Sequence, residues 1–269
     1  MPAIDIARLK IHAAVLVEKF DQPVAFLKDL HTILDIYADR TIRQGINASP
    51  VTVLPAFRVP QAVLRQIEME IGPLAATFPD QTIALTNSLW KDGYLESRLL
   101  AAALLGRIHP ETIFLLEHIT AWVSHTRDNS LRRALLRTSL SRIRKETPSK
   151  FLLLMRDWLD PSTPKMWANA IHAIIPLLED PTYQNLPPVY TLLSPAIKSM
   201  PSIMQNDLAD LINALYIASP IETTFFLRQV IIGASSHQMP ITIRRILPQL
   251  PADLRPVILE IVRLKSAQA

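Results

Sequence analysis

Cysteine is absent from this 269-residue chain, and glycine is scarce, at five residues. The absence of cysteine excludes a disulfide scaffold and thiolate chemistry, and it fits a reducing compartment. Five glycines do not form a phosphate-binding loop, so no nucleotide cofactor is predicted. The chain also lacks a secretory signal and an apolar run long enough to cross a bilayer. We therefore expect a cytoplasmic protein with no membrane contact.

Metal-ligand spacing is missing as well. The seven histidines are dispersed, and only His118 and His125 are spaced to share a helix face. No third ligand accompanies them at a zinc-binding spacing. The sequence therefore predicts neither a metal site nor any other cofactor.

Proline is abundant, at 22 residues, and its positions indicate helix starts. Sheets exclude proline, whereas helices accept it in their first turn. Prolines open segments with a helical apolar period at 110, 148, 164, 201, 220 and 251. Apolar stripes are predicted at Ile113, Leu116, Ile119 and Val123, at Leu131, Leu135, Leu136 and Leu140, and at Ile203, Leu208, Leu211, Ile212 and Leu215. The predicted helices span 3–19, 22–43, 60–71, 80–91, 94–108, 110–125, 128–145, 148–158, 164–179, 186–199, 201–217, 220–234, 240–248 and 251–265.

The spacing of these helices predicts the fold class. Short connections place neighbouring helices antiparallel, and pairs recur about every 40 residues, which is the unit of HEAT-type solenoids. We therefore predict an all-α, HEAT-like repeat solenoid, an α-α superhelix of stacked antiparallel helix pairs. An irregular segment at 44–59 separates an N-terminal helical pair, residues 1–48, from a HEAT-like array at 57–269 that is predicted to be one continuous domain.

Two motifs between residues 57 and 107 resemble the DNA alkylation repair family of HEAT-like glycosylases. The first is Phe57-Arg58-Val59-Pro60 followed by Val63-Leu64-Arg65-Gln66-Ile67. The second is Leu89-Trp90-Lys91-Asp92-Gly93-Tyr94-Leu95-Glu96-Ser97-Arg98-Leu99-Leu100-Ala101. In physical terms, Trp90 is expected to close one helix against the next, Gly93 to permit the turn, and Glu96 and Arg98 to frame the following helix.

The resemblance implies a curved helical stack that holds duplex DNA, including alkylated DNA, in a basic concave groove. In the family's alkylpurine glycosylases, an aspartate in a tryptophan-rich cleft stabilises the cationic sugar that develops during excision. The corresponding segment here reads Ser124-His125-Thr126-Arg127-Asp128-Asn129 and contains no tryptophan. The family's arginine and last cleft tryptophan are also missing, near 169 and 211–215. These departures argue against excision, and Asp128 is the only catalytic candidate.

Positive charge is concentrated in one segment of the chain. Residues 108–146 carry seven basic and four acidic side chains, whereas the two types balance before residue 108. Arginines in a row on a helix can follow a phosphate backbone. The predicted DNA-binding residues are Arg127, Arg132, Arg133, Arg137, Arg144, Lys145 and, from a later helix, Lys165. The alternative interpretation is a solvated helix face, with the last cations complementing the helix dipole.

Asp128 and three of the tryptophans also have an interpretation in which they serve the fold and not a functional site. Asp128 is placed to cap the helix that follows it. Trp122, Trp158 and Trp167 lie on apolar stripes and are expected in the core. Two functions remain open: a protein that binds duplex DNA, with glycosylase activity on alkylated purines if it is an enzyme, and a non-catalytic HEAT-like scaffold that binds a protein partner.

Overall fold

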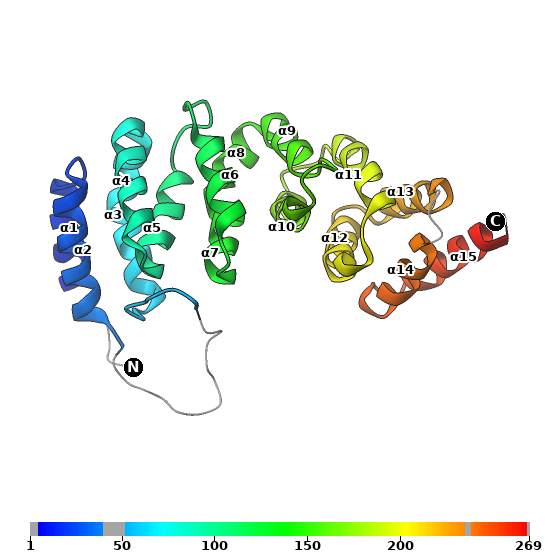
Figure 1. Ribbon diagram of the computed structural model, residues 1–269, viewed down its shortest axis with the longest axis horizontal. Coiled ribbons are helices and arrows are strands. Elements are labelled where there is room, and N and C mark those ends of the chain that lie inside the picture. Colours follow the sequence, from blue (N-terminus) through cyan, green and yellow to red (C-terminus); the bar gives the residue numbers. More distant parts are fainter. Residues whose placement is uncertain (1–4, 40–51, 235–237, 268–269) are drawn as a thin grey trace. The chain divides into compact units, whose positions relative to one another are not determined.

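The computed structural model describes residues 5–39, 52–234 and 238–267, and every regular element in these ranges is helical (Figure 1). The predicted all-α class is therefore confirmed, with no strand in the described ranges. The ends of two predicted helices, 3–4 and 40–43, and most of the irregular segment, 44–51, lie outside them.

The contacts divide the chain into two compact units, Met1–Pro148 and Ser149–Ala269. The helices of the first unit are α1 (Ile6–Glu18), α2 (Pro23–Tyr37), α3 (Gln61–Thr77), α4 (Pro79–Asp92), α5 (Leu95–Leu105), α6 (Leu115–His125), α7 (Asn129–Ala134), the π-helical turn η1 (Leu135–Ser139) and α8 (Ser141–Glu146). Within this unit, α1, α3, α5 and α7 pack in succession as one layer. Helices α2 and α4 pack side by side in a second layer, and stacked tryptophans join α4 to α6.

The second unit has the same two-layer construction. Its helices are α9 (Pro148–Trp158), the 3-10 turn η2 (Pro164–Met166), α10 (Trp167–Leu178), α11 (Pro187–Ser199), η3 (Ser202–Met204), α12 (Gln205–Ala218), α13 (Pro220–Gly233), α14 (Gln238–Ile246), η4 (Leu247–Gln249) and α15 (Leu254–Ala267). Helices α10, α12 and α14 form one layer, and α11, α13 and α15 form the other. Each helix pair therefore covers the apolar face of the next.

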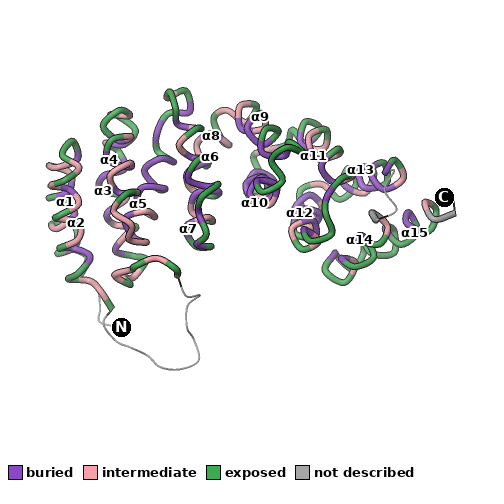
Figure 2. The backbone as a smooth tube through the Cα atoms, viewed as in Figure 1, coloured by how far each residue is buried: buried purple, intermediate pink, exposed green. Residues whose placement is uncertain are grey.

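Most residues of the predicted apolar stripes are buried, and Figure 2 shows buried positions recurring along the helices. The stripe of Leu131, Leu135, Leu136 and Leu140 is at most 2% exposed, which confirms that prediction. Two isoleucines assigned to stripes are instead exposed, Ile113 at 73% and Ile203 at 89%. Both precede their α-helices, because α6 begins at Leu115 and a 3-10 turn precedes α12.

Two predicted helix boundaries differ from the structure for identifiable reasons. Pro110 does not open α6; residues 109–114 form turns, and Phe114 adopts a left-handed conformation just before the helix. Helix α3 does not end at 71 but continues through Gly72 and Pro73 to Thr77. A proline inside a helix frees the carbonyl four residues earlier. Here that carbonyl belongs to Met69, and both Met69 and Pro73 are exposed, so solvent can reach it.

The predicted division into a helical pair at 1–48 and one continuous array at 57–269 stays a prediction, but the contacts of the irregular segment can be described. The described part of the irregular segment, from Thr52 onward, is bound to the helices of the first unit. The buried carboxylate of Glu96 on α5 accepts hydrogen bonds from the backbone N–H groups of Phe57 and Arg58, at 3.1 and 2.7 Å. Leu95 N–H also donates to Pro55 O at 2.9 Å. The N-terminal helices thus belong to the same unit as α3–α8, and the division falls after Pro148.

Candidate functional site

The arginine-rich helix predicted at 128–145 is interrupted by one π-helical turn. Helix α7 is followed by η1 and, after a break at Leu140, by α8. A π turn adds one residue per hydrogen-bonded loop and often marks a functional position. It also keeps Leu135 and Leu140, five residues apart, on the buried side. The turn therefore changes which arginines share an exposed face.

A close approach between α5 and η1 accompanies this turn. A Cβ atom on Gly106 would lie 2.3 Å from Thr138 O, so only glycine permits the observed contact. Beside it, the buried Ser139 hydroxyl donates to Ala102 O at 2.8 Å. Both contacts join the C-terminal end of α5 to the π turn.

Arg132, Arg142 and Arg144 make hydrogen bonds within the fold. Arg132 donates to Thr126 O at 2.9 Å, at the C-terminal end of α6. Arg144 donates to Leu136 O at 2.7 Å and also to Arg137 O, and so bridges the break between η1 and α8. Arg142 pairs with Glu146 and donates to Arg107 O, each at 2.7 Å. Arg132 and Arg144, both predicted to bind DNA, therefore bind backbone carbonyls.

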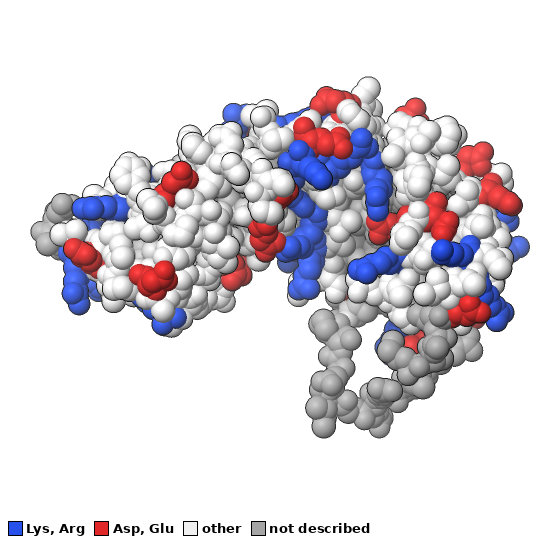
Figure 3. Space-filling model, turned by 180° about the vertical axis from the view of Figure 1, so that it is seen from behind, with Lys and Arg blue, Asp and Glu red and all other residues white. Residues whose placement is uncertain are grey.

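Four other cations of this segment are exposed: Arg127, Arg133, Arg137 and Lys145. We call these four residues the basic band. Figure 3 shows lysine and arginine side chains gathered over the part of the first unit that contains α7 and α8. The two acidic residues of 127–146 do little to neutralise the charge of these four cations, because Asp128 is buried and Glu146 pairs with Arg142. Lys165 is also exposed, and it belongs to η2 of the second unit.

Asp128 is the N-cap of α7, which confirms the structural interpretation. Its side chain is 6% exposed and accepts from Leu131 N–H at 2.9 Å. Burial raises the pKa of the carboxyl, but hydrogen bonds from the Leu131 backbone, the Thr52 side chain and the Ser130 and Val53 backbone more than offset this and lower its pKa. A carboxylate with these donors around it is a poor base. Catalysis by Asp128 remains a prediction that this geometry does not favour.

The tryptophans are packed between helices. Trp122, Trp158 and Trp167 are 8%, 3% and 4% exposed, in agreement with the core positions expected for them. Trp90 stacks on Trp122 with ring centroids 4.1 Å apart, and Arg98 lies over the Trp90 ring while donating to the Trp90 carbonyl at 3.0 Å. The described tryptophans therefore form no open aromatic cleft.

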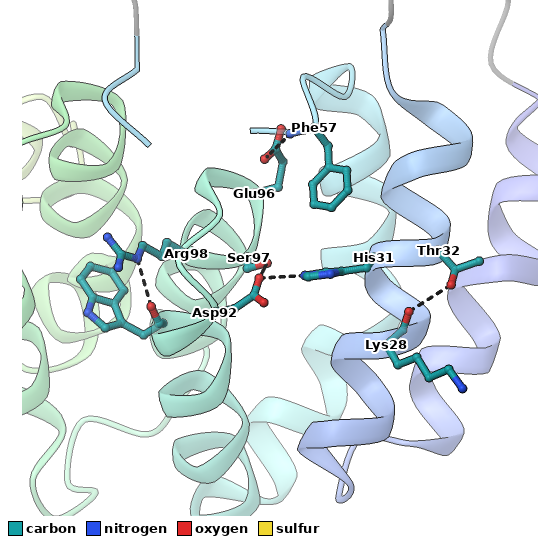
Figure 4. Close-up of polar contacts among 9 residues, drawn as sticks. Lys28, His31, Thr32, Phe57, Asp92, Glu96, Ser97 and Arg98 are labelled. Atoms are coloured by element: carbon teal, nitrogen blue, oxygen red, sulfur yellow. Dashed lines mark hydrogen bonds and ion pairs between the residues drawn. The ribbon is translucent and has the colours of Figure 1, made fainter. Parts of the chain in front are cut away.

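A polar cluster between α2 and α5 was not identified from the sequence (Figure 4). His31 contacts Asp92 at 2.9 Å, and the buried Ser97 hydroxyl donates to the same carboxylate oxygen at 2.5 Å. The rings of Phe57 and Tyr94 lie about this histidine, with centroids 5.2 and 5.1 Å from its own. Nucleophilic catalysis requires a serine that bonds to the histidine. Here the serine bonds to the aspartate, so the cluster joins α2 to the α4–α5 turn.

Among the described residues, no group of three His, Asp or Glu side chains is placed to hold a metal ion. No helix of the described ranges is both long and apolar enough to span a membrane. Comparison with protein-family models, curated proteins and solved structures returned no match to this chain. The resemblance to the DNA alkylation repair family therefore stays a prediction that rests on the motifs of residues 57–101.

Proposed function

We propose that this chain is a HEAT-like helical protein whose basic band binds the phosphate backbone of duplex DNA. The HEAT-like assignment is supported by the two-layer packing of successive helices within each unit. The binding surface is supported by the exposure of Arg127, Arg133, Arg137 and Lys145 in the segment 127–146, whose two carboxylates are buried or paired. A group of exposed cations suits a polyanion, and its contacts with phosphates are independent of base sequence.

Base excision is not part of this proposal. Asp128 is buried and surrounded by hydrogen-bond donors, and the tryptophans that could contact a deoxyribose are packed in the core. The proposed protein binds DNA, intact or alkylated, without releasing a base. The exposed arginines carry the proposal, whereas Arg132 and Arg144 act in the fold.

Arginine footprinting tests this assignment residue by residue. The full chain is treated with phenylglyoxal, with and without a 20-base-pair duplex at low salt, and modified peptides are quantified by mass spectrometry. We expect the duplex to protect Arg127, Arg133 and Arg137 and to leave Arg228, an exposed arginine of the second unit, equally reactive. Equal modification of all four residues with and without DNA would exclude the basic band as the binding surface.

A scaffold function has one specific observation in its favour. Three large apolar side chains in the second unit are strongly exposed: Ile217 at 79%, Ile221 at 84% and Phe225 at 63%. Ile221 and Phe225 are four residues apart on α13 and share a face. Apolar groups gathered on a surface are typical of protein contacts. A chain that binds no DNA at low salt would fit this second function better.

A further inference from the structure

The loop before α6 exposes two large apolar side chains directly before the helix, and we call this pair the apolar tip. Ile113 is 73% exposed and Phe114 is 61% exposed. Phe114 also has a backbone φ of +63° and ψ of 0°, a left-handed conformation that bulky residues rarely adopt. Strained residues persist where the surrounding structure holds them, and they are concentrated at functional sites. Phe114 therefore combines an exposed aromatic side chain with a strained backbone.

Hydrogen bonds from His118 hold the backbone of Phe114 in place. His118 Nδ1 donates to Phe114 O at 2.9 Å, and the His118 backbone N–H donates to the same oxygen at 3.0 Å. On the opposite side of the imidazole ring, Nε2 lies 3.4 Å from the Asn87 amide nitrogen on α4. His118 also packs edge-on against Trp122, which is part of the tryptophan stack between α4 and α6. Phe114 is therefore fixed in position although its side chain faces solvent.

This tip lies at the same end of the first unit as α8. Helix α6 leads away from the tip, and the segment α7–η1–α8 runs back after the turn at 126–128 (Figure 1). The hydrogen bond from Arg142 on α8 to Arg107 O joins α8 to the start of the same loop. Lys145, the last residue of the basic band, belongs to α8. A nucleic acid that follows the basic band toward α8 would thus reach the apolar tip.

We propose that Phe114, with Ile113 beside it, is a wedge that stacks against an unpaired or unstacked base of the nucleic acid held by the basic band. Apolar side chains that insert at base steps are used by proteins that bind distorted DNA. The charges would then supply general affinity, and the wedge would supply a preference for mispaired or bulged sites. This inference rests on the proposed function, because the band must first hold the backbone.

The size of the preference follows from base stacking. Stacking of one base on an aromatic side chain changes affinity by about 5- to 150-fold. The experiment compares an intact 20-base-pair duplex with a matched duplex that carries a two-nucleotide bulge with 2-aminopurine in it. Binding is measured by fluorescence anisotropy of an end label, and stacking by quenching of 2-aminopurine. We expect the full chain to bind the bulged duplex at least about 5-fold more tightly and to quench the probe.

Phe114→Gly is the informative variant because glycine adopts positive φ without strain, so its melting temperature should not fall below that of the parent. We expect it to lose the preference and the quenching while it binds the intact duplex as the parent does. Phe225→Ala, which removes an exposed phenylalanine of the second unit, is the matched control and should keep both. Arg133→Ala should weaken both duplexes equally.

The outcomes separate the two proposals. Equal affinity of the parent for both duplexes, or a preference that Phe114→Gly retains, would overturn the wedge and leave DNA binding by the band intact. No binding of either duplex at low salt would overturn the proposed function and the wedge with it. If Phe114 instead contacts a protein, the glycine variant will bind both duplexes as the parent does.

Discussion

The close approach of α5 to η1 makes Gly106→Ala a severe substitution. The added Cβ would lie 2.3 Å from Thr138 O and 3.3 Å from Ala103 O, both of them backbone atoms. A carbon and an oxygen at rest are about 3.4 Å or more apart, so α5 and the π turn must separate by roughly 1 Å. Overpacking of this kind costs about 1–3 kcal/mol, and we expect the upper part of that range because no flexible side chain can yield. The melting temperature of the first unit should fall by about 4–12 °C.

The matched control is Gly72→Ala in the same unit. A Cβ there meets only the flexible side chain of Arg107, at 3.6 Å. Alanine gains about 0.5–1 kcal/mol over glycine in a helix, but Pro73 follows directly and disfavours a helical residue with a Cβ before it. The net change should stay within about 1 kcal/mol. Urea and thermal unfolding of both variants give the comparison. Equal stabilities for the two variants would refute the argument that Gly106 is required by the α5–η1 contact.

Three further substitutions test single features. Gly93→Ala should lower the unfolding free energy by about 1–2 kcal/mol in urea titration, because Gly93 has a φ of +86°. Glu96→Gln should cost about 1–3 kcal/mol in the same assay, since the amide leaves Phe57 N–H or Arg58 N–H without an acceptor; an unchanged midpoint would show that this anchor contributes nothing. Asp128→Asn keeps the helix cap but does not titrate. The lowered pKa of Asp128 gives the parent stability that is present above the unfolded value of about 3.9 and is lost as pH falls through the folded pKa. The parent should therefore be the more stable protein at neutral pH, and a series of urea titrations from about pH 6 to pH 2 should show the gap closing.

Local features of this fold could be predicted from the sequence. The leucine stripe at 131–140, the left-handed Gly93 and the Asp128 cap all depend on residues within a few positions of one another, and the structure contains each of them. Helix periodicity and capping are local properties of the chain, so a single sequence carries their signal.

The candidate site was less predictable because it depends on distant contacts. The π turn packs against Gly106, about 30 residues earlier in the chain, and no pattern within 128–145 indicates it. The same applies to the arginines. Whether a guanidinium group faces solvent or binds a carbonyl, as that of Arg144 does, depends on where the helix breaks. One local signal was available for Phe114, since two large apolar residues precede the true start of α6.

The salt dependence of duplex binding tests the central claim most directly. Each phosphate contact contributes about −0.9 to the slope of log affinity against log salt, so the four residues of the basic band predict a slope near −3.6. The double variant Arg133→Ala/Arg137→Ala should reduce the magnitude of that slope by about 1.8, and Arg228→Ala should leave it unchanged. A parent slope near zero, or an equal loss in the Arg228 variant, would contradict DNA binding by the basic band.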